Sequence, residues 1–220
     1  MSISLALTTA GAIPDLDTLK SSVADWLDRD DLTSRLPTFI SLVESICNRE
    51  LRTPEMESTV TFTAINEDTP FPVNNFLAMR SIYVEGSPDR PLKAMAPNAL
   101  RQEFNGVVGV PTAYSIVSNA IRLAPPPNDD TLLTMDYFAS IDPLSVETPS
   151  NWLLEKHPGV YLFGTLYFAE AFLDNVTRAG QWKGLFDEAL GRVVKTSRNN
   201  RWGSGPLVPN LAIQVRGSAC

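Results

Sequence analysis

Cysteine and histidine are almost absent from this sequence. Its 220 residues include two cysteines, Cys47 and Cys220, and one histidine, His157. Two cysteines so far apart do not form a disulfide framework, and these three residues cannot supply the four ligands of a structural zinc site. Cys47 lies on an apolar helical stripe, where a free thiol acts as a small hydrophobic side chain. The cysteine content therefore fits a reducing cytoplasm.

Motifs for catalysis or nucleotide binding are also missing. The sequence has no phosphate loop of the Gly-x-x-x-x-Gly-Lys-Ser/Thr type, no Gly-x-Gly-x-x-Gly and no Gly-x-Ser-x-Gly. His157 is the one candidate base for a hydrolytic triad, but it precedes Pro158 at a helix junction, where a helix-end role is favoured. Asp28, Asp30 and Asp31 lack the glycine and distal glutamate of a calcium loop. We therefore predict no catalytic residue, no metal site and no cofactor.

One enzymatic alternative stays open at this point. Four carboxylates lie on different predicted elements, and two of them could meet as an acid and base pair: Glu44, Glu50, Asp136 and Glu170. Sequence spacing does not decide whether they do.

Long hydrophobic runs are lacking. The most apolar stretch, Val160–Leu173, is interrupted by Gly164 and Glu170 and is shorter than the ~20 residues of a membrane span. The first twelve residues have no basic region, so they do not resemble a secretory signal. No membrane association is expected.

Positive charge is scarce in the larger part of the chain. Residues 1–150 hold 10 Lys and Arg against 20 Asp and Glu, whereas residues 151–220 hold 8 against 5. The acidic part repels nucleic acid, which makes specific DNA binding a poor first hypothesis. A DNA-binding module would have to use the cations of the last helix and its end: Arg178, Lys183, Arg192, Lys195, Arg198 and Arg201.

Helical periodicity is present at both ends of the chain. Apolar residues at helical spacing predict helices over Asp15–Arg29 and Ser34–Leu51, with Pro37 tolerated in the first turn of the second. Beyond residue 150 the same period predicts a short helix from Asn151, a helix from Pro158 to about Leu173, and a long helix over Val176–Thr196.

Between these helices the period changes to two. Alternating apolar residues predict five strands: Thr59–Ala64, Phe76–Val84, Tyr114–Val117, Ala120–Leu123 and Thr131–Phe138. Ser118-Asn119 is a candidate tight turn between the third and fourth, and Pro97–Phe104 a short helix.

Aromatic residues recur on the predicted helices at both ends of the chain. Trp26, Trp152 and Trp182 fall on helical stripes and are predicted to lie in the core. More aromatic side chains crowd the helix from Pro158 than one face can bury, so four are candidates for packing between subunits: Tyr161, Phe163, Tyr167 and Phe168.

The C-terminal segment differs from the rest. Gly203-Ser204-Gly205-Pro206 is a loose joint, and beyond it apolar residues alternate as in a strand that has no neighbouring partner in sequence. Candidate binding residues of this arm are Arg201, Trp202, Leu207, Leu211, Ile213 and Val215.

The sequence resembles the head-to-tail adaptor, or connector, proteins of tailed bacteriophages, especially those of short-tailed phages. The segments that carry the resemblance are Trp26–Leu32, Arg35–Ile40, Asn48–Glu57, Gly109–Tyr114, Leu123–Pro127 and Pro149–Leu154, with Tyr161-Leu162 following. They are spread over residues 20–198, and their order and separation are more specific than any one of them.

The resemblance implies a virion neck protein assembled in the host cytoplasm. It implies a ring of commonly twelve subunits that docks on the portal protein, lets genomic DNA pass through its lumen without specific binding, and holds tail or nozzle proteins below. It provides no catalytic residues. The alternatives are a virion-associated hydrolase and another neck protein, such as a stopper or tail-completion subunit.

The predicted fold is therefore α+β. An antiparallel helical bundle, with two N-terminal and two to three C-terminal helices, would carry an inserted small antiparallel β-domain and an extended C-terminal arm. The predicted boundaries are 15–52 and 149–198 for the two parts of the helical domain, 53–148 for the β-domain, and 199–220 for the arm.

Overall fold

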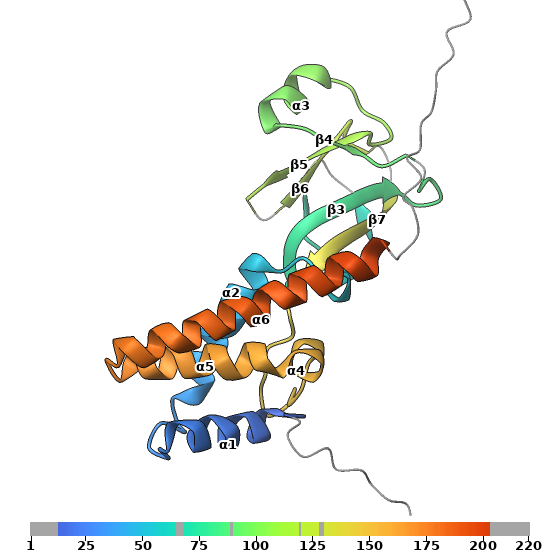
Figure 1. Ribbon diagram of the computed structural model, residues 1–220. Coiled ribbons are helices and arrows are strands. Elements are labelled where there is room, and N and C mark those ends of the chain that lie inside the picture. Colours follow the sequence, from blue (N-terminus) through green and yellow to red (C-terminus); the bar gives the residue numbers. More distant parts are fainter. Residues whose placement is uncertain (1–12, 65–67, 89, 119, 128–129, 203–220) are drawn as a thin grey trace, which may run out of the picture.

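The computed structural model describes residues 13–64, 68–88, 90–118, 120–127 and 130–202. Helices from both ends of this range form one domain, and a β-domain is inserted between the second and fourth α-helices (Figure 1). This arrangement confirms the predicted α+β class.

The first two helices have bounds that follow from local chemistry. Helix α1 spans Leu16–Leu27, and the Asp15 carboxylate caps it by accepting a 2.8 Å bond from the Thr18 amide. It ends where Asp28 adopts a left-handed conformation, with φ of 54°. Helix α2 spans Leu36–Glu50 and carries its proline in the first turn, as predicted.

The β-domain contains seven strands and one helix within the described residues. In chain order, after the short 3₁₀ helix η1 (Pro54–Met56), they are β1 (Glu57–Ala64), β2 (Asp68–Pro70), β3 (Phe76–Val84), β4 (Lys93–Ala94), α3 (Pro97–Glu103), β5 (Ala113–Val117), β6 (Ala120–Ala124) and β7 (Thr131–Ala139).

The strands form two sheets, in the orders β1-β7-β3 and β2-β6-β5-β4. The five predicted strands are all present, and Val117 faces Ala120 across the tight hairpin that was expected. Strands β2 and β4 were missed, and the β4–β5 pair is parallel, so the sheet is not wholly antiparallel. Both missed strands are too short to show an alternating pattern, and β2 contains a proline.

Three helices complete the helical domain: α4 (Trp152–Lys156), α5 (Pro158–Phe172) and α6 (Val176–Trp202). The Asn151 side chain caps α4 by accepting from the Leu154 amide at 3.0 Å. Between α5 and α6, Asp174 takes a left-handed conformation (φ 58°) and permits a sharp reversal of the chain.

Helix α6 is longer than predicted. It continues to Trp202, so the extended arm does not begin at residue 199 as expected. The two asparagines at 199 and 200 have low helix propensity but lie within this helix. Residues 203–220 lie outside the described residues.

Helix α5 is the centre of the helical domain. It contacts α1, α2, α4 and α6, and eight of its residues are buried: Val160, Tyr161, Leu162, Gly164, Thr165, Leu166, Ala169 and Glu170. Gly164 sits where α2 and α6 approach, since a Cβ atom built there would lie 2.7 Å from Val43 and 3.0 Å from Phe186. The glycine that interrupts the apolar run therefore allows the helices to pack closely.

Candidate functional site

The four candidate carboxylates are not assembled into a catalytic pair. Glu50 is exposed, and Asp136 lies on β7, where it accepts hydrogen bonds from the hydroxyls of Thr59 and Ser81, each at 2.7 Å. Glu170 is buried and forms an ion pair with Arg178. Within the described ranges, no three His, Cys, Asp or Glu side chains are grouped so as to hold a metal ion.

Glu44 has a structural role in a buried polar network. Its Oε1 accepts hydrogen bonds from the Leu144 amide at 2.8 Å and from the Tyr161 hydroxyl at 3.2 Å. The Asn151 amide group donates to the same hydroxyl and to the Asp142 carbonyl, both at 2.8 Å. This Glu44 network fastens residues 140–151, which return from the β-domain, to α2 and α5.

Burial raises the pKa of the Glu44 carboxyl above its usual range, and the hydrogen bonds from Leu144 and Tyr161 oppose that rise. Because the folded-state pKa exceeds the unfolded one, folding favours the protonated acid. This contribution to stability is present below the ordinary glutamate pKa of about 4.3 and is lost as the pH rises through the folded-state value.

Glu44→Gln is neutral at every pH and keeps the carbonyl acceptor. We therefore expect its free energy of unfolding to improve relative to the wild type as the pH rises from about 4 to 8. Urea denaturation at both pH values measures this difference. Glu50→Gln, on the exposed face of the same helix, is the control and should show a much smaller change. Parallel pH curves for Glu44→Gln and the wild type would contradict this interpretation.

His157 and Cys47 have the structural environments expected of them. His157 ends α4 and precedes α5, its amide donates to the Leu153 carbonyl at 2.9 Å, and burial lowers its pKa. Burial also raises the pKa of the Cys47 thiol to about 12, with the nearby Glu44 adding to the effect. A thiol with so high a pKa is not a nucleophile at neutral pH.

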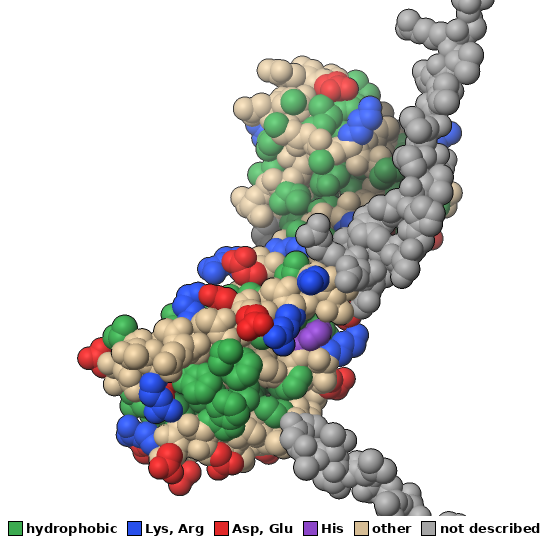
Figure 2. All heavy atoms as spheres, viewed as in Figure 1, with side chains coloured by type: hydrophobic (Ala, Val, Ile, Leu, Met, Phe, Trp, Pro, Cys, Tyr) green, Lys and Arg blue, Asp and Glu red, His purple; other side chains and the backbone are tan. Residues whose placement is uncertain are grey.

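An exposed aromatic surface lies where α1, α5 and α6 meet. Trp26, Phe163 and Trp182 pack with ring centroids 5.5 to 6.2 Å apart, one from each helix. Trp26 remains 49% exposed, which corrects its predicted place in the core, because it lies beside the buried stripe of α1. Figure 2 shows hydrophobic side chains gathered on this face, over α5 and between α1 and α6. We call these three residues the aromatic face.

The four aromatic residues predicted to pack between subunits differ in burial. Tyr161 is fully buried in the chain's own core, so it is unavailable to a neighbour and that prediction is wrong for it. Its hydroxyl belongs to the Glu44 network. Phe163, Tyr167 and Phe168 are half-buried and retain exposed surface. Their role between subunits stays a prediction.

Comparison with protein families decides which family the chain represents. The model of the SU10 adaptor protein family matches residues 14–210, which include both helical segments and the complete β-domain. The chain belongs to this family. The match confirms the resemblance to phage head-to-tail adaptors. A search for relatives among curated proteins found no match.

The arm residues of this SU10-family adaptor are only partly placed. Arg201 and Trp202 form the end of α6, and their side chains are outside the described part. Leu207, Leu211, Ile213 and Val215 also lie outside the described residues. Their binding role stays a prediction.

Three of the six candidate DNA-binding cations pair with acids, and the side chains of Arg198 and Arg201 lie outside the described part. Lys183 pairs with Asp187 and Arg192 with Glu188, each one helical turn away, while Arg178 pairs with Glu170. Lys195 is exposed. Cations paired in this way are less available to phosphate groups, which weakens the DNA-binding alternative. Among the described helices of the adaptor, none has the length and apolarity needed to cross a membrane.

Proposed function

We propose that this chain is the head-to-tail adaptor of a tailed bacteriophage, a structural protein of the virion neck and not an enzyme. Its copies form a ring that docks on the portal, extends the DNA channel and holds tail or nozzle proteins. The observation that carries the proposal is the family match over residues 14–210. Assembly takes place in the host cytoplasm and involves no membrane.

The aromatic face is the proposed contact between neighbouring subunits. Tryptophan and phenylalanine are enriched at interfaces because they bury a large apolar area with little loss of side-chain freedom. Trp26, Phe163 and Trp182 are partly exposed on one surface, and Tyr167 lies one helical turn after Phe163 on α5, with its ring against that of Phe168. A ring of about twelve copies, the number that the adaptor resemblance implies, would bury this face repeatedly.

The lumen is proposed to pass DNA without gripping it. Residues 1–150 carry twice as many acidic as basic side chains, so they repel phosphate groups. Tight DNA binding requires clustered, unpaired Lys and Arg. The ion pairs of α6 reduce the number of such groups in the basic part of the chain.

The C-terminal residues are proposed to bind the portal. Leu211, Ile213 and Val215 alternate with more polar residues, a pattern suited to adding a strand to an exposed sheet edge or lying in a groove. Arg201 and Trp202 at the end of α6, with Leu207 beyond them, would anchor the arm at its root.

Truncation after Trp202 tests the portal-binding arm. Because α6 ends at this residue, the helical content and thermal transition of the truncated chain should match the wild type. Its binding to portal rings of the same phage should weaken by roughly 2 kcal/mol or more, the scale of losing anchor residues from an interface. Biolayer interferometry on immobilised portal rings measures the loss.

A pair of point variants controls for truncation. Side chains alternate between the two faces of a strand, so Ile213→Asp should weaken portal binding strongly, while Gln214→Asp should leave it near the wild-type value. Unchanged binding of the truncated chain would remove the arm from the proposal, and equal effects of the two point variants would remove strand addition.

A further inference from the structure

The end of the β-domain farthest from the helical domain exposes an apolar loop between α3 and β5 (Figure 1). Val107, Val108 and Val110 are 47%, 59% and 66% exposed. Their exposure is not caused by a loose backbone, because the loop is tied down at both ends. The Val107 amide donates to the Phe104 carbonyl at 3.1 Å, and the Gly109 amide donates to the Pro126 carbonyl at 2.9 Å. Fixed exposed apolar groups of this kind mark interaction surfaces.

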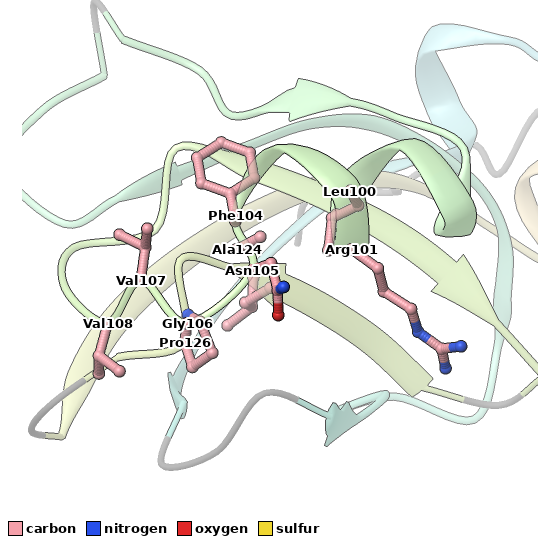
Figure 3. Close-up of a pocket in the computed structure, with 10 residues that line it drawn as sticks. Leu100, Arg101, Phe104, Asn105, Gly106, Val107, Val108, Ala124 and Pro126 are labelled. Carbon is pink, nitrogen blue, oxygen red and sulfur yellow. The ribbon is translucent and has the colours of Figure 1, made fainter.

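A pocket of about 370 Å³ lies beside this loop. Its wall is mainly apolar and is formed by Leu100 and Phe104 of the α3 region, by Val107 and Val108, and by Ala124 at the end of β6 with Pro126 beyond it. Figure 3 shows Phe104 on one side and the Val107–Val108 loop on the other, with Arg101 extending from α3. A second pocket of about 540 Å³ borders Val110 and is lined by Pro91, Lys93 and Thr112, among others. The loop thus separates two hollows.

Backbone donors are also available at this loop. The amides of Val107 and Gly109 donate to the Phe104 and Pro126 carbonyls, whereas those of Val108 and Val110 have no hydrogen-bond partner among the described residues. Backbone amides without a partner are donors that a bound polypeptide can use.

Two cations lie beside the loop in a protein of net charge -7, Arg101 on α3 and Lys93 on β4. Arg101 at the first pocket and Lys93 at the second form no ion pair with any residue that the structure describes. Arg122 lowers the pKa of Asp68 and binds both oxygens of that carboxylate at 2.6 and 2.7 Å, and the charge of Arg101 adds a smaller effect. The positive charge of Arg101 is therefore available to a partner.

We call the surface formed by Val107, Val108, Val110, Phe104 and Arg101 the valine tip. We propose that the valine tip docks an extended segment of a tail protein. The segment inserts an apolar side chain between Phe104 and the valine loop, and it places a carboxylate beside Arg101. A neighbouring copy in the ring is not the expected occupant, because the proposed contact between subunits is the aromatic face of the helical domain, whereas the tip lies at the far end of the β-domain (Figure 1). The inference rests on the proposed adaptor function and specifies where and how the tail attaches.

Particle assembly tests the valine tip in the intact protein. Val108→Asp and Arg101→Glu each make the tip repel an acidic segment, and Val108→Asp also removes apolar contact. Particles produced when each variant complements an adaptor-null phage are counted by electron microscopy. We expect adaptor rings on the portals in normal number and at least a tenfold fall in the fraction of particles that carry tails. The matched controls are Val146→Asp, at a valine that is 90% exposed, and Arg49→Glu, at an exposed arginine on α2; both should assemble normally.

Failure of the inference differs visibly from failure of the proposed function. Normal tails with both tip variants would overturn the valine tip alone. If either tip variant lost the ring or its attachment to the portal, the tip would contact a neighbouring copy or the portal. That result would also overturn the valine tip as a docking site for a tail protein. Wild-type particles that contain no adaptor ring would overturn the proposed function.

Crosslinking identifies the occupant. With Val108→benzoylphenylalanine in assembled virions, mass spectrometry should find a crosslinked tail peptide with an apolar residue and an Asp or Glu close to it in sequence. A crosslinked peptide that is basic, or that comes from this chain, would contradict the proposal.

Discussion

Gly164→Val is expected to prevent stable packing of the helical domain. A Cβ atom at residue 164 would lie 2.7 Å from Val43 Cγ2 and 3.0 Å from two ring carbons of Phe186. Both neighbours are buried on helices packed around α5, so neither can move without opening the core. Overpacking of this kind costs typically 1–3 kcal/mol, and the branched valine should reach about 3 kcal/mol or more. Urea denaturation followed by circular dichroism measures the loss.

Gly164→Ala separates packing from backbone effects. Alanine favours a helix over glycine by about 1 kcal/mol, so the net loss of stability should be smaller, roughly 1–2 kcal/mol. Gly180→Ala and Gly184→Ala on α6 are matched controls because nothing lies within 4 Å of a Cβ atom there. Both should raise the free energy of unfolding by up to about 1 kcal/mol. If Gly164→Ala raised the free energy of unfolding, the packing of α5 against α2 and α6 would be loose enough to accept a methyl group, contrary to this prediction.

The helices were predictable from the sequence because their ends carry local signals. The predicted Asp15–Arg29 and Ser34–Leu51 differ from the observed α1 and α2 by one or two residues at each end. Asp15 marks the first N-terminus by its capping carboxylate, and Pro37 fits only a first turn. These signals need no knowledge of the tertiary structure.

The order of the strands within each sheet could not be predicted from the sequence. Strand β7 is the last in the chain but lies between β1 and β3, and β4 pairs with β5 in parallel. Alternation of apolar residues predicts that a strand has one buried face, but it does not say which strand lies beside it. The division into two sheets therefore came only from the structure.

The sequence also did not show which aromatic side chains are buried and which are exposed. Helix α5 is packed on several sides, so it shows no single apolar stripe that would separate buried from exposed positions. Tyr161 was consequently predicted to face a neighbour, although its hydroxyl satisfies Glu44 inside the core. Trp26 shows the reverse error, since it was assigned to the core and lies on the surface.

The valine tip had a weak signal in the sequence. Val107 and Val108 stand between Gly106 and Gly109, and Val110 precedes Pro111, without the alternation of a strand. Such a valine cluster also occurs in protein cores. Their exposed fractions, and the backbone bonds to Phe104 and Pro126 that fix the loop, came only from the structure.

Trp26→Ser combined with Phe163→Ser is expected to abolish ring assembly while leaving a folded monomer. Both side chains belong to the aromatic face, and Trp26 is half exposed, so much of its apolar surface awaits burial. Loss of an aromatic anchor at the centre of an interface commonly costs 2 kcal/mol or more, about 30-fold in affinity. In a ring this loss is repeated at every contact, because each interface carries the same substitutions. Native mass spectrometry of the variant with portal rings should find no closed oligomer.

Phe172→Ser is the matched control for this loss of assembly. Phe172 is 52% exposed, close to the value for Trp26, and it also packs against an aromatic ring, that of Phe39 at 5.7 Å. It lies at the end of α5 outside the aromatic face, so its loss should reduce stability modestly and leave the ring intact. The thermal transition of each variant, measured separately, shows whether the monomer has folded. If the double variant folds and still closes rings on the portal, the aromatic face is not the contact between subunits; if Phe172→Ser alone breaks the ring, that contact runs through the other end of α5.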